Sequence, residues 1–154
     1  MEKLPDIQSE MVWLNQEFHF PKGKYILPGP LPIPEELSMK RVAAEDREDV
    51  DRLRLLAQEA PNEYNDPLAK ALSNLGVSLS DLGRYEEAVQ VTQEAVDIAR
   101  KLYEKKCKSH EAQYLYACLL ENSGIRLYEA KRYSESFSCC LTADMMFKKI
   151  HPKY

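Results

Sequence analysis

LAKALSNLGVSLSDLGRYEEAVQVTQEAVDIARKL, residues 68–102, is the stretch of this chain that decides its fold. Its first half repeats leucine at helical spacing, at Leu68, Leu72, Leu75 and Leu79. Gly83 then interrupts the pattern, and a glycine at such a place supplies the left-handed backbone that ends a helix. The second half carries an apolar stripe from Ala88 to Leu102. The stretch therefore predicts two amphipathic helices joined by a short turn, and an all-α fold.

A weaker copy of this stretch follows it. Residues 68–102 align with residues 116–150 without a gap, and Gly124 follows Gly76 by 48 residues. Residues of the same size class pair at six positions: Leu72 with Leu120, Gly76 with Gly124, Leu79 with Leu127, Tyr85 with Tyr133, Ala95 with Ala143 and Leu102 with Ile150. The second copy departs where Lys131, Ser136 and Ser123 replace Gly83, Ala88 and Leu75. The agreement indicates an internal repeat of a helical hairpin.

The order LSNLGVSL, then GRYEEA, then EA resembles the tetratricopeptide repeat. The resemblance covers about residues 68–150 and implies an α-α superhelix of stacked hairpins. The residues that carry it are Leu72, Gly76, Tyr85, Ala88, Ala95, Leu120, Gly124, Tyr133 and Ala143. A spacing of 48 residues exceeds the common period of about 34. The chain is thus most similar to long repeats of the kinesin-light-chain type or those attached to fungal and bacterial signalling ATPases.

A proline-rich stretch divides the chain. Residues 1–34 are expected to form an irregular N-terminal arm and linker, because PGPLPIP favours an extended polyproline-II path. A short apolar stripe in this arm either packs on the main domain or docks on a neighbouring chain; its residues are Ile7, Met11, Leu14 and Phe18. Residues 35–154 are expected to form the repeat domain, with a leading helix at 35–60 and hairpins at 67–106 and 109–150.

Local signals predict where the hairpins begin and what the last helix buries. Asp66 is expected to cap a helix that starts at Pro67 after a polar turn over 62–66, and Ser109 to cap the first helix of the second hairpin. The last helix offers several side chains for burial: Phe137, Cys140, Leu141, Met145, and Phe147 or Ile150. We expect this end to be covered by the arm, a second copy or a further repeat.

The resemblance also implies a binding site. In this family the first helices of successive repeats line a concave groove whose polar residues take the ligand. The corresponding positions here are Lys70, Ser73, Asn74, Val77, Asp81, Cys118, Glu121, Asn122, Ile125 and Glu129. Asn74 and Asn122 align, and both amides could hydrogen-bond an extended peptide, or they could be exposed helix asparagines. Ser73 and Val77 stand where a clamp for chaperone-tail carboxylates needs Lys and Asn, so that ligand is not expected.

The sequence lacks the signals of several other classes of protein. It has no GxGxxG, GxxxxGK[ST], HExxH or GxSxG motif, and His19, His110 and His151 are far apart. We therefore expect no catalytic site, no metal site and no cofactor. Residues 61–154 carry 13 basic and 13 acidic side chains, which offers nucleic acid little to bind. No apolar run approaches the roughly 20 residues of a membrane span, and four cysteines without CxxC spacing favour the cytoplasm.

Two functions remain from the sequence. The first is a non-enzymatic adaptor or scaffold that binds a peptide or helix of another protein in the groove. The second is a structural subunit of a larger assembly or homo-oligomer, in which the arm and the terminal helix pack on neighbouring chains.

Overall fold

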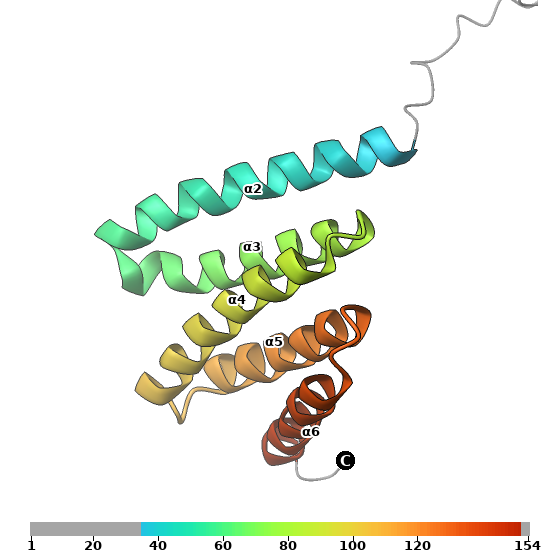
Figure 1. The fold of residues 1–154 in the computed structure, drawn as a ribbon. Helices are drawn as coiled ribbons and strands as arrows, with labels where there is room; N and C mark the ends of the chain where they lie inside the picture. The colour runs from blue at the N-terminus through green and yellow to red at the C-terminus, as the bar shows by residue number, and fades with distance from the viewer. Residues whose placement is uncertain (1–34, 152–154) are drawn as a thin grey trace, which may run out of the picture. The chain divides into compact units, whose positions relative to one another are not determined.

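The computed structural model describes residues 35–151, which fold into α-helices that follow one another in chain order (Figure 1). The helices are α2 (Glu35–Glu59), α3 (Pro61–Asp81), α4 (Tyr85–Lys105), α5 (His110–Glu129) and α6 (Tyr133–Ile150). The prediction of an all-α fold built of helical hairpins is confirmed. The apolar stripe from Ile7 to Phe18 lies outside the described residues, so its packing on the main domain or on a neighbouring chain stays a prediction.

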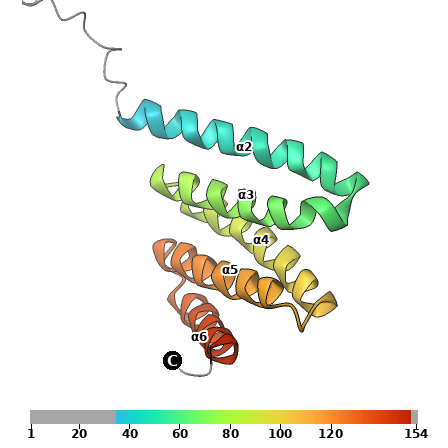
Figure 2. The same cartoon turned by 180° about the vertical axis from the view of Figure 1, so that it is seen from behind.

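Each helix packs against the next, and α3 also contacts α5. Two opposite views show α3 with α4, and α5 with α6, as successive hairpins below α2 (Figures 1 and 2). The contact between α3 and α5 places the first helices of the two hairpins side by side. A surface made by both first helices therefore exists, as the repeat pattern requires.

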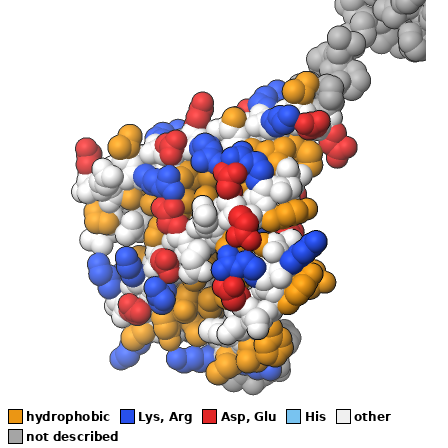
Figure 3. Space-filling model, viewed as in Figure 1, with side chains coloured by type: hydrophobic (Ala, Val, Ile, Leu, Met, Phe, Trp, Pro, Cys, Tyr) orange, Lys and Arg blue, Asp and Glu red, His pale blue; other side chains and the backbone are white. Residues whose placement is uncertain are grey.

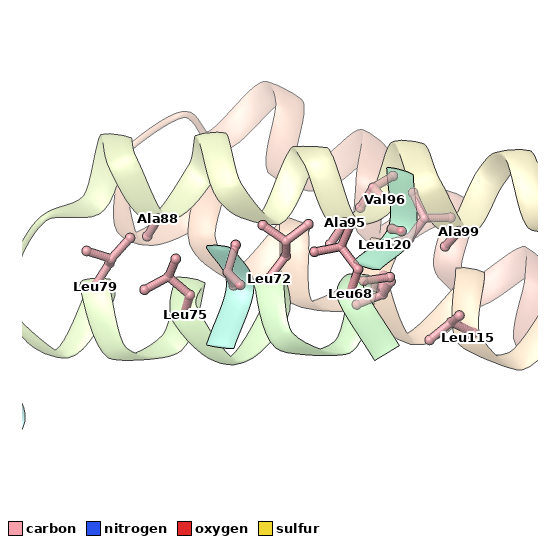
Figure 4. Close-up of a cluster of buried hydrophobic side chains, with 14 of the residues drawn as sticks. Leu68, Leu72, Leu75, Leu79, Ala88, Ala95, Val96, Ala99, Leu115 and Leu120 are labelled. Atoms are coloured by element: carbon pink, nitrogen blue, oxygen red, sulfur yellow. The ribbon is translucent and has the colours of Figure 1, made fainter. Parts of the chain in front are cut away.

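The core forms where the leucines of α3 meet the alanines of α4 (Figure 4). Leu72 and Leu79 are fully buried, and Ala88 of α4 is too. Small side chains on one helix let large ones on the other fill the space between the two axes. Burying one leucine contributes about 1.5–3 kcal/mol. Val50 of α2 and Leu120 of α5 join the same cluster, so both hairpins share one core.

Glycine is required where the paired helices approach most closely. A methyl group at Gly76 would overlap the hydroxyl of Thr92 in α4, and one at Gly124 would overlap the sulfur of Cys140 in α6. Thr92 is 1% exposed, and its hydroxyl has no hydrogen-bond partner within residues 35–151. Cys140 was predicted to lie in the core, and this is wrong, because its side chain is exposed. The helix backbones approach equally closely in the two hairpins, since the added methyl group would lie 3.4 Å from Ala88 O in the first and 3.4 Å from Ser136 O in the second.

The turns of the two hairpins have the same geometry. Gly83 takes the left-handed conformation predicted for it, with φ of 75°, and Lys131 takes it with φ of 62° despite its side chain. The backbone hydrogen bonds of the two turns also match. In the first turn, Gly83 N donates to Ser80 O at 2.8 Å and Arg84 N donates to Leu79 O at 2.9 Å. In the second turn, Lys131 N donates to Tyr128 O at 2.9 Å and Arg132 N donates to Leu127 O at 2.8 Å. Both turns end the first helix as a Schellman motif does.

The predicted start of the first hairpin is wrong. α3 begins at Pro61 rather than Pro67, so residues 62–66 are helical and Asp66 is not a cap. The Ala60 carbonyl accepts from the amides of Glu63 and Tyr64, which closes the first turn. Tyr64 then packs against the core, and this burial offsets the backbone hydrogen bond that Pro67 cannot donate. The predicted cap at Ser109 is confirmed, since its side chain accepts from Ala112 N at 3.4 Å.

The last helix buries less than predicted. Phe137, Leu141 and Met145 are 71%, 49% and 65% exposed, and apolar side chains gather at that end of the molecule in Figure 3. Val89, which stands where Phe137 does in the first hairpin, is only 5% exposed. The reason is that α4 is followed by α5, whereas within the described residues no helix follows α6. Ile150 is buried as predicted.

Polar side chains also tie helices that are two places apart in the chain. Arg54 of α2 bonds Glu94 of α4 at 2.6 Å between Nη2 and Oε2. Lys149 Nζ of α6 lies 3.3 Å from the Tyr103 hydroxyl of α4. Basic and acidic side chains are interspersed on the face seen in Figure 3. These contacts join α4 to the leading helix α2 and to α6, the second helix of the next hairpin.

Candidate functional site

A hollow of about 590 Å³ lies between α3 and α5, the first helices of the two hairpins. From α3 it is lined by Asp66, Lys70, Ser73 and Asn74; from α5 it is lined by Glu111, Tyr114, Leu115, Cys118, Leu119 and Asn122. This volume falls within the usual range for sites that take a ligand or a few side chains, about 300–1,000 Å³. Both apolar and polar side chains line the hollow: Leu115 and Leu119 are buried, whereas Lys70, Asn74 and Glu111 are exposed.

The structure brings half of the predicted groove residues to this hollow. Lys70, Ser73, Asn74, Cys118 and Asn122 line it. Farther along the same two helices, Val77 and Ile125 are 43% and 42% exposed. They stand 48 residues apart, at the same place in each repeat. Asp81 and Glu121 are exposed beside them, so the hollow continues into a partly apolar surface.

Asn74 and Asn122 occupy equivalent positions but differ in their surroundings. Asn122 Nδ2 donates to the hydroxyl of Ser73 at 3.0 Å, and Ser73 is only 7% exposed. One amide donor of Asn122 is therefore used to hold α5 against α3. Asn74 is exposed on α3 and is one of the residues that line the hollow. Of the two asparagines, Asn74 has the side chain better placed for a ligand.

Glu129 has a similar structural use at the other end of the helix pair. It accepts a hydrogen bond from the hydroxyl of Ser80 in α3. Arg126 Nε lies 3.2 Å from Glu129 Oε2, and the Arg126 side chain is only 12% exposed. Arg126 Nε is not aligned for a hydrogen bond with any described residue, so this contact is an interaction of charges. The pair of ties, through Ser73 and through Ser80, sets the distance between the helices that line the hollow.

Sequence reasoning missed Tyr114, which stands at the rim of the hollow. Its ring is 55% exposed and meets the ring of Phe147 edge-on, with centroids 6.1 Å apart. The alignment of the two copies began at Leu68 and Tyr116, so Tyr114 and its counterpart Asp66 fell just outside it. Extending the alignment by two residues toward the N-terminus would have included both.

Tyr114 and Cys118 form a polar pair on α5. A hydrogen bond to Cys118 raises the pKa of Tyr114 above its ordinary value. Burial raises the pKa of the Cys118 thiol, against the opposing effect of that hydrogen bond. Cys118 therefore stays a neutral thiol at neutral pH, and a thiol is a poor nucleophile. The pair shapes the wall of the hollow and offers no nucleophilic catalysis.

Other kinds of site are not found in the described part of the chain. Within residues 35–151 no three side chains of His, Cys, Asp or Glu come together to hold a metal ion. No helix described here is long and apolar enough to cross a membrane.

The fold and the hollow together define a class: a helical-repeat protein with stacked hairpins whose first helices share a surface. Residues 68–110 match the tetratricopeptide repeat family, a match that covers most of α3, all of α4 and the start of α5. No curated protein and no solved structure matches the chain. The chain thus contains a tetratricopeptide repeat, which implies protein partners in general. Proteins built of such repeats are typically non-catalytic.

Proposed function

We propose that this chain is a non-enzymatic adaptor that binds a peptide or helix of another protein in the groove between α3 and α5. The observation that carries the proposal is the hollow of about 590 Å³ between the first helices of both hairpins. Its floor is formed by Leu115 and Leu119, which are 9% and 3% exposed. An apolar side chain of a partner would fill this floor, and burying it would contribute about 1.5–3 kcal/mol.

Hydrogen bonds at the rim would orient the bound segment. An asparagine amide both donates and accepts, so Asn74 could pair with a peptide N–H and a carbonyl at the same time. Val77 and Ile125 extend the apolar surface beyond the hollow. A segment longer than one residue would therefore find contacts along the length of both helices.

The test is affinity capture from the native cell, compared between the wild-type chain and Asn74→Ala. We expect the variant to capture less of its partners with an unchanged melting temperature, because Asn74 is exposed. Asn62→Ala is the matched control, since Asn62 is an exposed asparagine of the same helix outside this hollow. Equal capture by all three proteins would contradict the groove. Asn122→Ala is less suited as a test because losing its bond to Ser73 should also lower the melting temperature.

The exposed face of α6 favours a second function, that of a structural subunit. Phe137, Leu141 and Met145 recur at every fourth position and so lie along one side of the helix. The corresponding positions of α4 are Val89, which is buried, and two polar residues, the exposed Gln93 and the half-buried Asp97, so the exposed apolar stripe is peculiar to α6. We propose Leu141→Glu in the full chain, with the mass in solution as the measurement. A fall from an assembly to a monomer supports the structural role, whereas a monomer in both proteins contradicts self-assembly.

We further infer that residues 109–150 form a second, diverged repeat of the long type. Support comes from the matched turns at Gly83 and Lys131 and from the close approach at Gly76 and Gly124. Substituting the second hairpin's departures with the residues of the first tests this. Lys131→Gly should preserve or raise the melting temperature if the two turns are equivalent. Ser136→Ala should instead lower it, because the Ser136 hydroxyl donates a buried hydrogen bond to Gly124 O at 2.7 Å that an alanine cannot make.

A further inference from the structure

The charged side chains of the groove face include two cations, Lys70 and Arg126, and each is paired with a carboxylate. Lys70 Nζ lies 2.8 Å from Asp66 Oδ1, and Arg126 Nε lies 3.2 Å from Glu129 Oε2, both on this face. The remaining charges around it are exposed carboxylates, on Asp81 of α3 and on Glu111 and Glu121 of α5. None of the ion pairs formed within residues 35–151 includes any of these three.

The face made by the second helices is balanced by contrast. Glu94 of α4 is paired with Arg54, and Glu86 lies 3.4 Å from Arg132. Basic and acidic groups thus meet on that side of the molecule, as Figure 3 shows. On the groove side Asp81, Glu111 and Glu121 form no ion pair within residues 35–151, so their negative potential is left for a ligand to neutralise.

The negative charge of Glu121 acts on Cys118, a residue that lines the hollow. The pKa of Cys118 is raised first by burial, and the negative charge of Glu121 adds to the rise. Glu111 lines the hollow at the opposite end from Asn122, one turn before Leu115. Carboxylates therefore stand at the edges of an apolar floor rather than at random on the surface.

We propose that the groove selects a basic segment of a partner protein, one in which an apolar side chain is flanked by lysine or arginine. This inference deepens the proposed function and rests on it. The apolar side chain would occupy the floor formed by Leu115 and Leu119. The flanking cations would pair with Glu111 on one side and with Glu121 or Asp81 on the other.

Complementary charge contributes more to the choice of the segment that binds than to the affinity of the bound segment. Opposite charges steer a segment to the groove and raise the rate of association, whereas like charges repel it. An acidic segment would bring its carboxylates next to Glu111 and Glu121, and the two cations of this face, Lys70 and Arg126, are already paired with carboxylates of the chain. Acidic tails and acidic linear motifs are therefore the ligands that this groove rejects.

The experiment is a selection of random peptides displayed on phage against the full chain, followed by affinity measurement on synthetic copies of the enriched peptides. We expect enrichment of lysine and arginine beside leucine, isoleucine or phenylalanine. Raising the salt from about 50 to 500 mM should weaken binding, because the Debye length falls from roughly 14 to 4 Å.

Two charge reversals locate the effect. The variant Asp81→Lys with Glu121→Lys should weaken binding of the enriched peptides about tenfold, which is the scale of two exposed charge contacts. The matched control is Glu48→Lys with Glu59→Lys, because both residues are exposed on α2 and the change in net charge is the same. Binding to the control should stay within about twofold of wild type.

The outcomes separate this inference from the proposed function. Enriched peptides that are neutral or acidic, yet lose affinity for Asn74→Ala, overturn the basic ligand and keep the groove. An equal loss in the α2 control shows that net charge alone acts, and it also overturns the inference. No enrichment, or peptides that bind all variants equally, contradicts both.

Discussion

The contact between Gly76 and Thr92 supports a quantitative prediction about how closely α3 and α4 must pack. Gly76→Ala places a methyl group on the Thr92 hydroxyl. Thr92 cannot readily turn away, because it is 1% exposed and β-branched residues have few rotamers in a helix. Overpacking of this kind costs about 1–3 kcal/mol, while replacing a helical glycine by alanine gains about 1 kcal/mol. The expected net loss is about 1 kcal/mol, taken as the difference between these two effects.

Thr92→Ala should reverse the sign of the Gly76 substitution. It removes the overlapping hydroxyl, which has no hydrogen-bond partner among the described residues. In that background Gly76→Ala keeps its gain of about 1 kcal/mol in helix propensity. The double-mutant cycle should therefore show a coupling free energy of about 2 kcal/mol between the two positions.

Urea unfolding of the four proteins, followed by circular dichroism, measures this coupling. Gly124→Ala with Cys140→Ala is the matched cycle in the second hairpin, where the facing side chain is exposed and able to move aside. Its coupling should be smaller. The reasoning is refuted if Gly76→Ala stabilises the wild-type chain as much as it stabilises the Thr92→Ala variant, since the helices would then separate freely to admit the methyl group.

Three further predictions concern the turns, the ties between helices and the effect of pH. Lys131→Gly should raise the free energy of unfolding by up to about 1 kcal/mol by relieving left-handed backbone, whereas Gly83→Ala should lower it by a similar amount, both read from urea midpoints. Arg54→Gln should cost no more than about 1 kcal/mol, because its partner Glu94 and the arginine itself are both about 40% exposed; a larger loss in the same assay would show that this tie carries more than a surface ion pair. Hydrogen bonds from Arg84 and Arg132 lower the pKa of Glu87 and Glu135 from 4.5, so the stability they add is complete above that value and is lost as pH falls through the lowered folded-state pKa. Glu87→Gln with Glu135→Gln should therefore make the urea midpoint fall less steeply below about pH 4.5, and an unchanged slope would contradict it.

Much of the fold follows from local patterns in the chain. The leucines of α3 recur at helical spacing, and Gly83 and Ser109 are residues whose backbone and side-chain preferences belong to helix ends. The start of α3 could not be predicted in the same way. Pro61 and Pro67 both suit a first helical turn, and the choice between them depends on Tyr64 reaching a core that only the folded chain provides.

The candidate site was predictable in position and less so in detail. Repeat spacing places Asn74 and Asn122 on equivalent turns of α3 and α5. It does not show that Ser73 lies within 3.0 Å of Asn122, because that distance depends on how two non-consecutive helices pack. Tyr114 was missed for a related reason, since helix length beyond the repeat pattern is set by tertiary contacts.

The ties between alternate helices have a mechanical consequence. α6 rests on α5 and is also joined to α4 through Lys149 and Tyr103, while α4 in turn is joined to α2 through Arg54 and Glu94. A stretching force applied at the C-terminal end therefore has to break the contact of Lys149 with Tyr103 as well as the packing of α6 on α5. The load passes to two neighbours at once, and the piece that yields first under tension should be a whole hairpin rather than one helix.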